Sequence, residues 1–135
     1  MMQKFAIGYF WFLTVTFLAI GLALVIAPEG ILKNVDVQFE TPTARSDIRA
    51  DYGGCVLGIT CFLAICGMTG RVKSGLLCVG LILLGYASGR LYSLAVDGTP
   101  KSIIYYLLAF ELVTGTLAVY LSRLVSARGE KPKAA

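Results

Sequence analysis

Two charged residues, Arg90 and Glu111, stand out because each is the only charged side chain in a long apolar run. Asp97, Gly98 and Pro100 lie between the two runs and predict a tight turn. Because hydrocarbon disfavours charge, both charged side chains are expected to face protein or a polar cavity. Helical side chains lean toward the N-terminus of their own helix, so these two side chains should converge from antiparallel helices. The spacing therefore predicts an internal arginine–glutamate pair that could bind a ligand, exchange a proton or fix the register of the helices.

The composition indicates which elements hold this pair. The chain has 135 residues, of which 57% are apolar and 15% charged, a balance typical of an integral membrane protein. Four apolar runs are each close to the roughly 20 residues that an α-helix needs to cross about 30 Å of hydrocarbon. We predict an all-α fold, with residues 1–135 forming a single membrane domain built as a four-transmembrane-helix bundle. The helices are expected at about residues 5–27, 42–69, 74–96 and 100–124, the second with Thr41 as its cap and Pro42 in its first turn.

The distribution of Lys and Arg predicts the orientation of the bundle. With four spans, the termini and the second connection share one side, which carries seven of these residues: Lys4, Arg71, Lys73, Arg123, Arg128, Lys131 and Lys133. The opposite side carries Lys33, Arg45, Arg49 and Lys101, together with Arg90 if it is counted with its nearer face. Both termini are therefore expected to be cytoplasmic, with residues 126–135 as a basic tail. The longest connection, residues 28–41, would then lie outside, either as a partial lid or as an ordinary amphipathic surface loop.

A polar cluster is predicted around the charged pair in the outer half of the bundle. One face of the third helix is polar at helical spacing, and the start of the second helix carries Arg45, Arg49 and Tyr52 at i, i+4 and i+7. The N-terminal ends of the second and fourth helices point to the same side and favour an anion there, such as a carboxylate or a phosphate headgroup. The predicted ligand-binding residues are Arg49, Tyr52, Tyr86, Arg90, Ser93, Asp97 and Glu111.

Two G-x-x-x-G spacings predict where helices pack. Gly54 and Gly58 lie in the second helix, and Gly85 and Gly89 lie in the third, directly before Arg90. Such spacing leaves a smooth face on which another helix backbone can approach closely. We therefore expect the second and third helices to be in close contact through these four glycines.

The residue types present exclude several classes of chemistry. The chain has no histidine, which excludes histidine-ligated haem, histidine-bound zinc and histidine acid–base catalysis. No Gly-rich phosphate loop or G-x-S-x-G elbow is present. The four cysteines lie in apolar runs without a C-x-x-C pair and are interpreted as small apolar fillers: Cys55, Cys61, Cys66 and Cys78. We predict no metal, no cofactor and no nucleic-acid partner.

Three motifs together carry a resemblance to a known family. They are Arg49-Ala50-Asp51-Tyr52-Gly53-Gly54, Gly89-Arg90 with Asp97-Gly98, and Glu111. With this set the chain resembles a family of small bacterial four-helix integral membrane proteins of unknown function, similar in layout to the wider DoxX-like group. The resemblance covers nearly the whole chain and implies a four-helix fold in a bacterial inner membrane. The wider group includes accessory subunits of quinone-linked oxidoreductases and assembly factors, but the matched residues carry no assigned reaction.

Two classes of function follow from these features. In the first, the charged pocket binds a lipid, a quinone or a small amphipathic ligand, or the protein serves as an accessory or assembly subunit, with a membrane-protein partner or a second copy of itself. In the second, Glu111 cycles a proton as the acid/base of an isomerase-like enzyme or of a proton-coupled transporter. A tight pair between Arg90 and Glu111 would favour the first class. A Glu111 that faces an open cavity without a cationic partner would favour the second.

Overall fold

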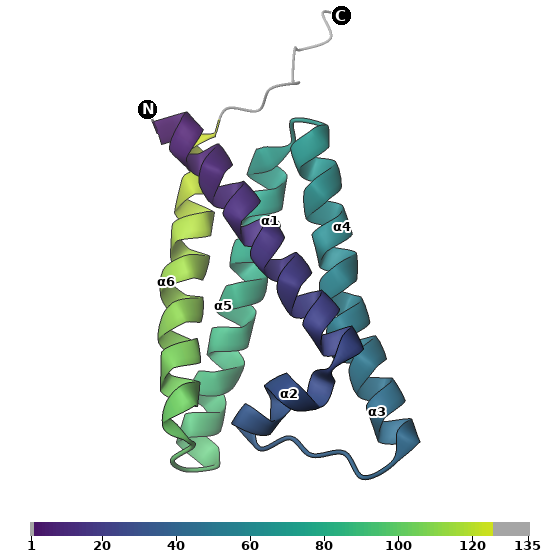
Figure 1. Cartoon of the computed structure of the whole chain (residues 1–135). Coiled ribbons are helices and arrows are strands. Elements are labelled where there is room, and N and C mark those ends of the chain that lie inside the picture. Colours follow the sequence, from purple (N-terminus) through teal and green to yellow (C-terminus); the bar gives the residue numbers. More distant parts are fainter. Residues whose placement is uncertain (1, 126–135) are drawn as a thin grey trace, which may run out of the picture.

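The computed structural model describes residues 2–125, and this part of the chain is helical and contains no strand. Its elements are α1 (Met2–Ile26), α2 (Pro28–Leu32), the 3₁₀ segment η1 (Lys33–Val35), α3 (Pro42–Ile48), the π-helical segment η2 (Arg49–Gly54), α4 (Cys55–Met68), α5 (Val72–Val96) and α6 (Ser102–Leu124) (Figure 1). Four helical stretches are long and apolar enough to cross a membrane: α1, the continuous run Pro42–Met68, α5 and α6. The predicted all-helical, four-span architecture is thus confirmed, whereas the predicted tail, residues 126–135, lies outside the described residues.

The positions of the helices follow from local chemistry. In hydrocarbon each backbone N–H and C=O must be satisfied within its own segment, so long apolar runs without proline become continuous helices. The prolines lie outside these runs instead: Pro28 and Pro42 begin α2 and α3, and Pro100 lies between α5 and α6. Thr41 caps α3 as its side chain accepts a hydrogen bond from the backbone N–H of Ala44, at 3.2 Å.

The second span changes its winding at η2, which the sequence pattern does not predict. A π-helical turn holds more residues than an α-helical turn, so the side chains on either side of it are rotated relative to α-helical spacing. The π-helical segment therefore changes the angle between Tyr52 and the arginines Arg45 and Arg49 relative to the i, i+4, i+7 spacing expected from the sequence. Gly53 of this segment is buried against α1, since a Cβ atom there would lie 2.6 Å from Cγ2 of Val25 and 3.0 Å from its backbone nitrogen.

The helices associate as two pairs. In one pair, α5 lies along α6, and Gly80 and Gly115 bring their backbones together: a Cβ atom on Gly115 would lie 3.1 Å from the carbonyl oxygen of Gly80. In the other pair, α1 packs on η2 and α4, with Gly67 against the Trp11 ring. The hydroxyl of Tyr9 donates a hydrogen bond to the Thr114 carbonyl, at 3.0 Å, and so links α1 to α6.

The hydrophobic core lies toward one end of the bundle. We call the end that holds Met2 and Val125 the terminal end and the opposite end, which holds α2 and the α5–α6 turn, the loop end (Figure 1). The clustered core residues include Ala6 to Phe17 of α1, Val72 to Leu83 of α5 and Ala118 to Val125, the parts of these segments nearest the terminal end. On α5 the last buried residue is Ala87, and on α6 the first is Leu108. Toward the loop end the two pairs of helices are therefore not joined by a packed core.

The expected contact through Gly54, Gly58, Gly85 and Gly89 is not formed within the described residues. A Cβ atom at Gly58, Gly85 or Gly89 would meet nothing within 4 Å, and one at Gly54 would meet only a carbonyl of its own helix, at 3.6 Å. Close helix approaches occur at other glycines instead, as at Gly53 and at the Gly80–Gly115 contact. The reason is that a smooth helix face permits a close approach but does not select the neighbour that covers it.

The connection between α1 and α3 folds over the loop end (Figure 1). Two residues of α2 are buried, and η1 ends at Asp36, whose φ of 60° is in the left-handed region that Asp tolerates better than most residues. Arg45 of α3 pairs with Glu29 at 2.9 Å, and Lys101 at the start of α6 pairs with Asp36. These contacts tie the segment Pro28–Asp36 to both pairs of helices, so we refer to it as the lid.

Candidate functional site

Arg90 and Glu111 form an ion pair between α5 and α6. Nε of Arg90 donates to both carboxylate oxygens of Glu111, at 3.0 and 2.9 Å. Glu111 lies between the buried residues Leu108 and Thr114 on the face of α6 that packs on α5, and its side chain is only 7% exposed. Arg90 follows Ala87, the last buried residue of α5, by one helical turn, and its side chain is 28% exposed. The carboxylate is therefore enclosed by protein, whereas the guanidinium remains reachable.

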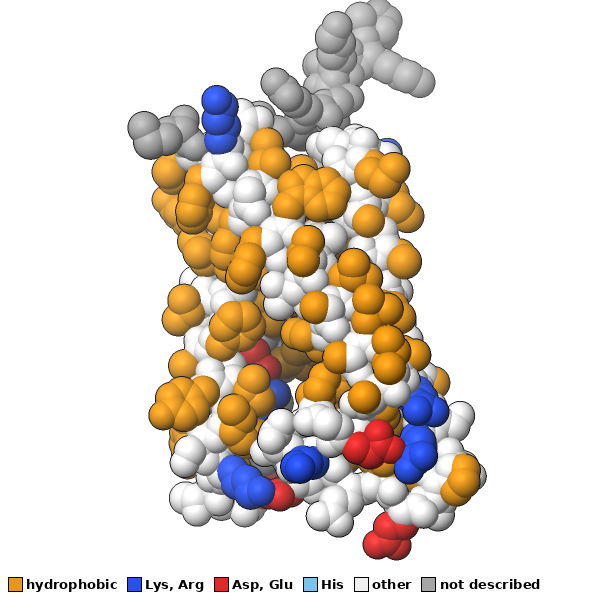
Figure 2. Space-filling model, viewed as in Figure 1, with side chains coloured by type: hydrophobic (Ala, Val, Ile, Leu, Met, Phe, Trp, Pro, Cys, Tyr) orange, Lys and Arg blue, Asp and Glu red, His pale blue; other side chains and the backbone are white. Residues whose placement is uncertain are grey.

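The surface of the molecule is hollowed beside this level of the bundle. Figure 2 shows the hollow in the half nearer the lid, with basic and acidic side chains visible inside it and apolar side chains around it. The hollow lies on the side of the bundle where α1 crosses in front of α5 and α6 in Figure 1. Polar groups in an apolar concave surface are the usual composition of a small-molecule site.

A cleft of about 250 Å³ adjoins the exposed part of Arg90. It lies under the lid and against the ends of α5 and α6, and its lining combines charged and apolar side chains. The lining residues are Val35, Asp36, Arg90, Ser93, Leu94, Pro100, Lys101 and Ile104. Arg90 thus belongs both to the ion pair and to the cleft.

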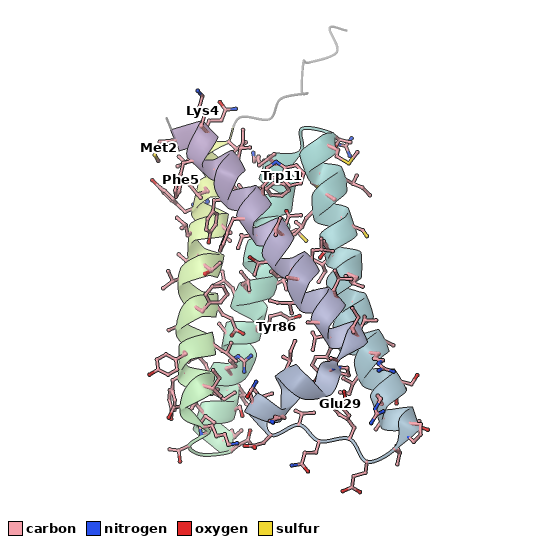
Figure 3. The ribbon with its side chains drawn as sticks, viewed as in Figure 1. Met2, Lys4, Phe5, Trp11, Glu29 and Tyr86 are labelled. Atoms are coloured by element: carbon pink, nitrogen blue, oxygen red, sulfur yellow. The ribbon has the colours of Figure 1, made fainter. Side chains whose placement is uncertain are left out.

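The remaining residues predicted for the pocket are arranged less closely. Ser93 lines the cleft and donates a hydrogen bond to the carboxylate of Asp97, at 2.6 Å, but Asp97 itself is not part of the lining. Tyr86 lies near the middle of the bundle (Figure 3), and Tyr52 is an exposed residue of η2; neither of them lines the cleft. Arg49 is an exposed residue of η2 that does not line the cleft.

Two charged lining residues, Asp36 and Lys101, are absent from the predicted set. Lys101 follows Pro100 in the turn after α5. It is close enough to Arg90 along the chain that it could have been predicted as a site residue. Asp36 reaches the site only through the path of the lid, and no local spacing indicates this. From the sequence pattern, Asp36 and Lys101 would be assigned to the protein surface. The fold brings both of them close to the Arg90–Glu111 pair.

Four membrane-length apolar helices with an ion pair between two of them indicate an integral membrane protein. The chain belongs to the family described as domain of unknown function DUF4345, whose model matches residues 6–122. The match includes both residues of the ion pair, the second and third spans, and most of the first and fourth. Comparison with curated proteins and with solved structures found no match.

Proposed function

We propose that the protein binds an amphipathic molecule, such as a membrane lipid, a quinone or a small amphiphile, beside the Arg90–Glu111 pair. The observation that carries this proposal is that burial on α5 ends at Ala87 and burial on α6 begins at Leu108, while Arg90, just beyond Ala87, lines a cleft with partly apolar walls. An ion pair that served only to hold two helices together would not need a reachable guanidinium. Arg90 is reachable and lines a cleft, as a group that recognises a ligand must.

The contact geometry favours binding over proton chemistry at Glu111. Both carboxylate oxygens accept from Nε of Arg90, and the side chain is buried. A general acid or base must present an oxygen to the group with which it exchanges a proton. Glu111 is engaged on both oxygens, so its role in the proposal is to orient Arg90.

A second candidate function is that of an accessory or assembly subunit that packs against a helix of another membrane protein. Gly58, Gly85 and Gly89 favour it, because each has open space where a side chain would lie. Small residues at a helix surface are typical of helix contacts in membranes. We also propose that the protein is related to the DoxX-like group, whose four-helix layout it resembles. An accessory or assembly role would agree with that relationship.

We further propose a bacterial inner membrane as the setting, with both termini in the cytoplasm and the lid outside, supported by the excess of Lys and Arg on the side of the termini. The test uses two single-cysteine proteins in which the four native cysteines are replaced by alanine. Asn34→Cys places a thiol in the lid, and Thr69→Cys places one at the opposite end; both positions are exposed. A membrane-impermeant maleimide added to intact cells should label the first and not the second. Labelling of the second alone would reverse the orientation.

The binding proposal is tested by native mass spectrometry of protein extracted gently from its own membrane. The wild type is compared with the double variant Arg90→Gln and Glu111→Gln, in which two neutral amides of similar size replace the ion pair. Arg71→Gln is the matched control, because it removes an exposed arginine far from the lid. A small molecule retained by wild type and control but lost from the double variant supports binding. A protein that co-purifies in its place supports the second candidate, and a wild type that carries neither overturns both.

A further inference from the structure

The contact between Arg90 and Glu111 uses only part of the arginine. The guanidinium donates through Nε, and among residues 2–125 its two Nη groups have no hydrogen-bond partner. In this part of the chain no buried side-chain nitrogen or oxygen lacks a partner, so the Nη groups are not buried. The outer edge of a guanidinium offers two parallel N–H donors that match the two oxygens of a carboxylate or a phosphate. Glu111 therefore holds Arg90 from behind while this edge remains free.

A second cation, Lys101, lines the same cleft and is held by an exchangeable partner. Its ammonium group pairs with Asp36 of the lid, and the two side chains are 56% and 62% exposed. Ion pairs this exposed are weak, because water solvates both groups well when they separate. An anion that enters the cleft can therefore replace Asp36 at Lys101, and the released Asp36 side chain rotates toward the solvent.

The size and lining of the cleft indicate how much of a ligand it holds. Its volume of about 250 Å³ is below the range of about 300–1,000 Å³ typical of sites that enclose a whole small molecule. Arg90 and Lys101 supply hydrogen-bond donors, and Leu94 and Ile104 supply apolar wall. Such a cleft fits a headgroup and the first carbons of a chain, with the rest of the chain outside in the hollow or the bilayer.

We infer that the ligand is an anionic amphiphile whose carboxylate or phosphate headgroup lies between the Nη edge of Arg90 and the ammonium of Lys101, in place of Asp36. This inference rests on the proposed binding function and specifies its ligand class. It predicts opposite effects from the two members of one ion pair. Lys101→Gln removes a cation and weakens binding of the anion, whereas Asp36→Asn removes the competing carboxylate and strengthens it.

The other ion pair of the lid supplies the matched control. Glu29 and Arg45 also tie the lid to the bundle, with similar exposure, but neither lines the cleft. If the variants acted only by loosening the lid, Glu29→Gln and Asp36→Asn would change binding in the same way. If they act on the anion, Glu29→Gln leaves the affinity unchanged.

The experiment titrates the full chain in a nonionic detergent with dodecyl phosphate, dodecanoate and dodecanol, with native mass spectrometry as the readout. We expect dodecyl phosphate or dodecanoate to bind at least about tenfold more tightly than dodecanol, and Lys101→Gln to reduce that affinity about tenfold. Asp36→Asn should raise it about two- to fivefold, since it removes a weak competing pair. The anion that binds more tightly identifies the headgroup. Inorganic phosphate is a fourth probe and shows whether the alkyl chain of the ligand contributes to the affinity.

The outcomes separate this inference from the function on which it rests. Equal affinity for dodecanol and the two anions, or a decrease with Asp36→Asn, would overturn the anionic headgroup while an amphiphile site remained. Inorganic phosphate that binds as tightly as dodecyl phosphate would retain the anion site and overturn the amphiphile. Absence of binding by all four probes would overturn both.

Discussion

Replacement of Arg90 by glutamine should destabilise the bundle more than replacement of Glu111 by glutamine. In Arg90→Gln, the carboxylate of Glu111 is left in a place where only 7% of its side chain is exposed. In Glu111→Gln, the guanidinium of Arg90 is left instead, but 28% of that side chain is exposed and adjoins a cleft. Water can reach the stranded arginine more easily than the stranded glutamate, so the two halves of one ion pair should have unequal costs.

The size of the difference follows from the burial of each group. Removal of one partner from a buried ion pair costs about 3–5 kcal/mol, and we expect the lower limit for Arg90→Gln, because this pair is only partly buried, with 28% of the Arg90 side chain exposed. For Glu111→Gln we expect about 1 kcal/mol, since the arginine keeps a hydrogen-bond acceptor and access to water. The double variant replaces both charges with amides of similar shape and should cost about 1–2 kcal/mol. The coupling free energy of the pair would then be about 2–3 kcal/mol.

The assay is unfolding by SDS in mixed micelles, followed through Trp11 fluorescence. Trp11 is the only tryptophan and packs between Phe10, with ring centroids 5.5 Å apart, and Gly67 of α4, so its emission reports the contact between α1 and α4. A coupling free energy below about 0.5 kcal/mol would refute direct pairing, because independent sites are additive within that limit. A Glu111→Gln variant at least as unstable as Arg90→Gln would refute the argument from unequal burial.

Two further predictions concern the packing that holds the site. Gly115→Ala should destabilise the protein by about 1–3 kcal/mol, because the new methyl group would lie 3.1 Å from the Gly80 carbonyl oxygen and force α5 and α6 apart. Gly85→Ala is the control, since its methyl group would meet nothing within 4 Å. This control should be neutral or slightly stabilising in the same SDS titration. Tyr9→Phe should cost about 0.6 kcal/mol, the average for a hydrogen bond between membrane helices, through loss of the contact with the α6 backbone. An unchanged SDS midpoint for Gly115→Ala, or a loss above about 2 kcal/mol for Tyr9→Phe, would contradict these assignments.

Much of the fold was predictable because membrane-spanning helices are specified locally. The length of each apolar run, the prolines between the runs and the Thr41–Pro42 cap set helix boundaries that agree with the structure within three residues at every end. The convergence of Arg90 and Glu111 also follows from local information, since a tight turn joins two adjacent antiparallel helices. Distance along the chain then limits how far apart their side chains can lie.

The glycine contacts show where local information ends. Gly58, Gly85 and Gly89 match a recognised packing pattern, yet a Cβ atom on any of them would meet no other segment within 4 Å. Gly80 and Gly115 match no such pattern and bring α5 and α6 together. The sequence shows only that one face of a helix carries small residues. Which helix covers that face depends on how all four helices pack at once, and that is a property of the whole bundle.

The sequence alone was sufficient for the four membrane-length helices and for the presence of one internal charge pair, because both depend on the free energy of placing each segment in hydrocarbon. The winding of η2, the one-sided core and the entry of Asp36 and Lys101 into the site required the tertiary structure. These features arise where segments distant in the chain compete for the same space or the same charge. The cleft exists because α1 leans on α4 and leaves α5 and α6 uncovered near the lid, an outcome of packing between helices that no single run of residues contains.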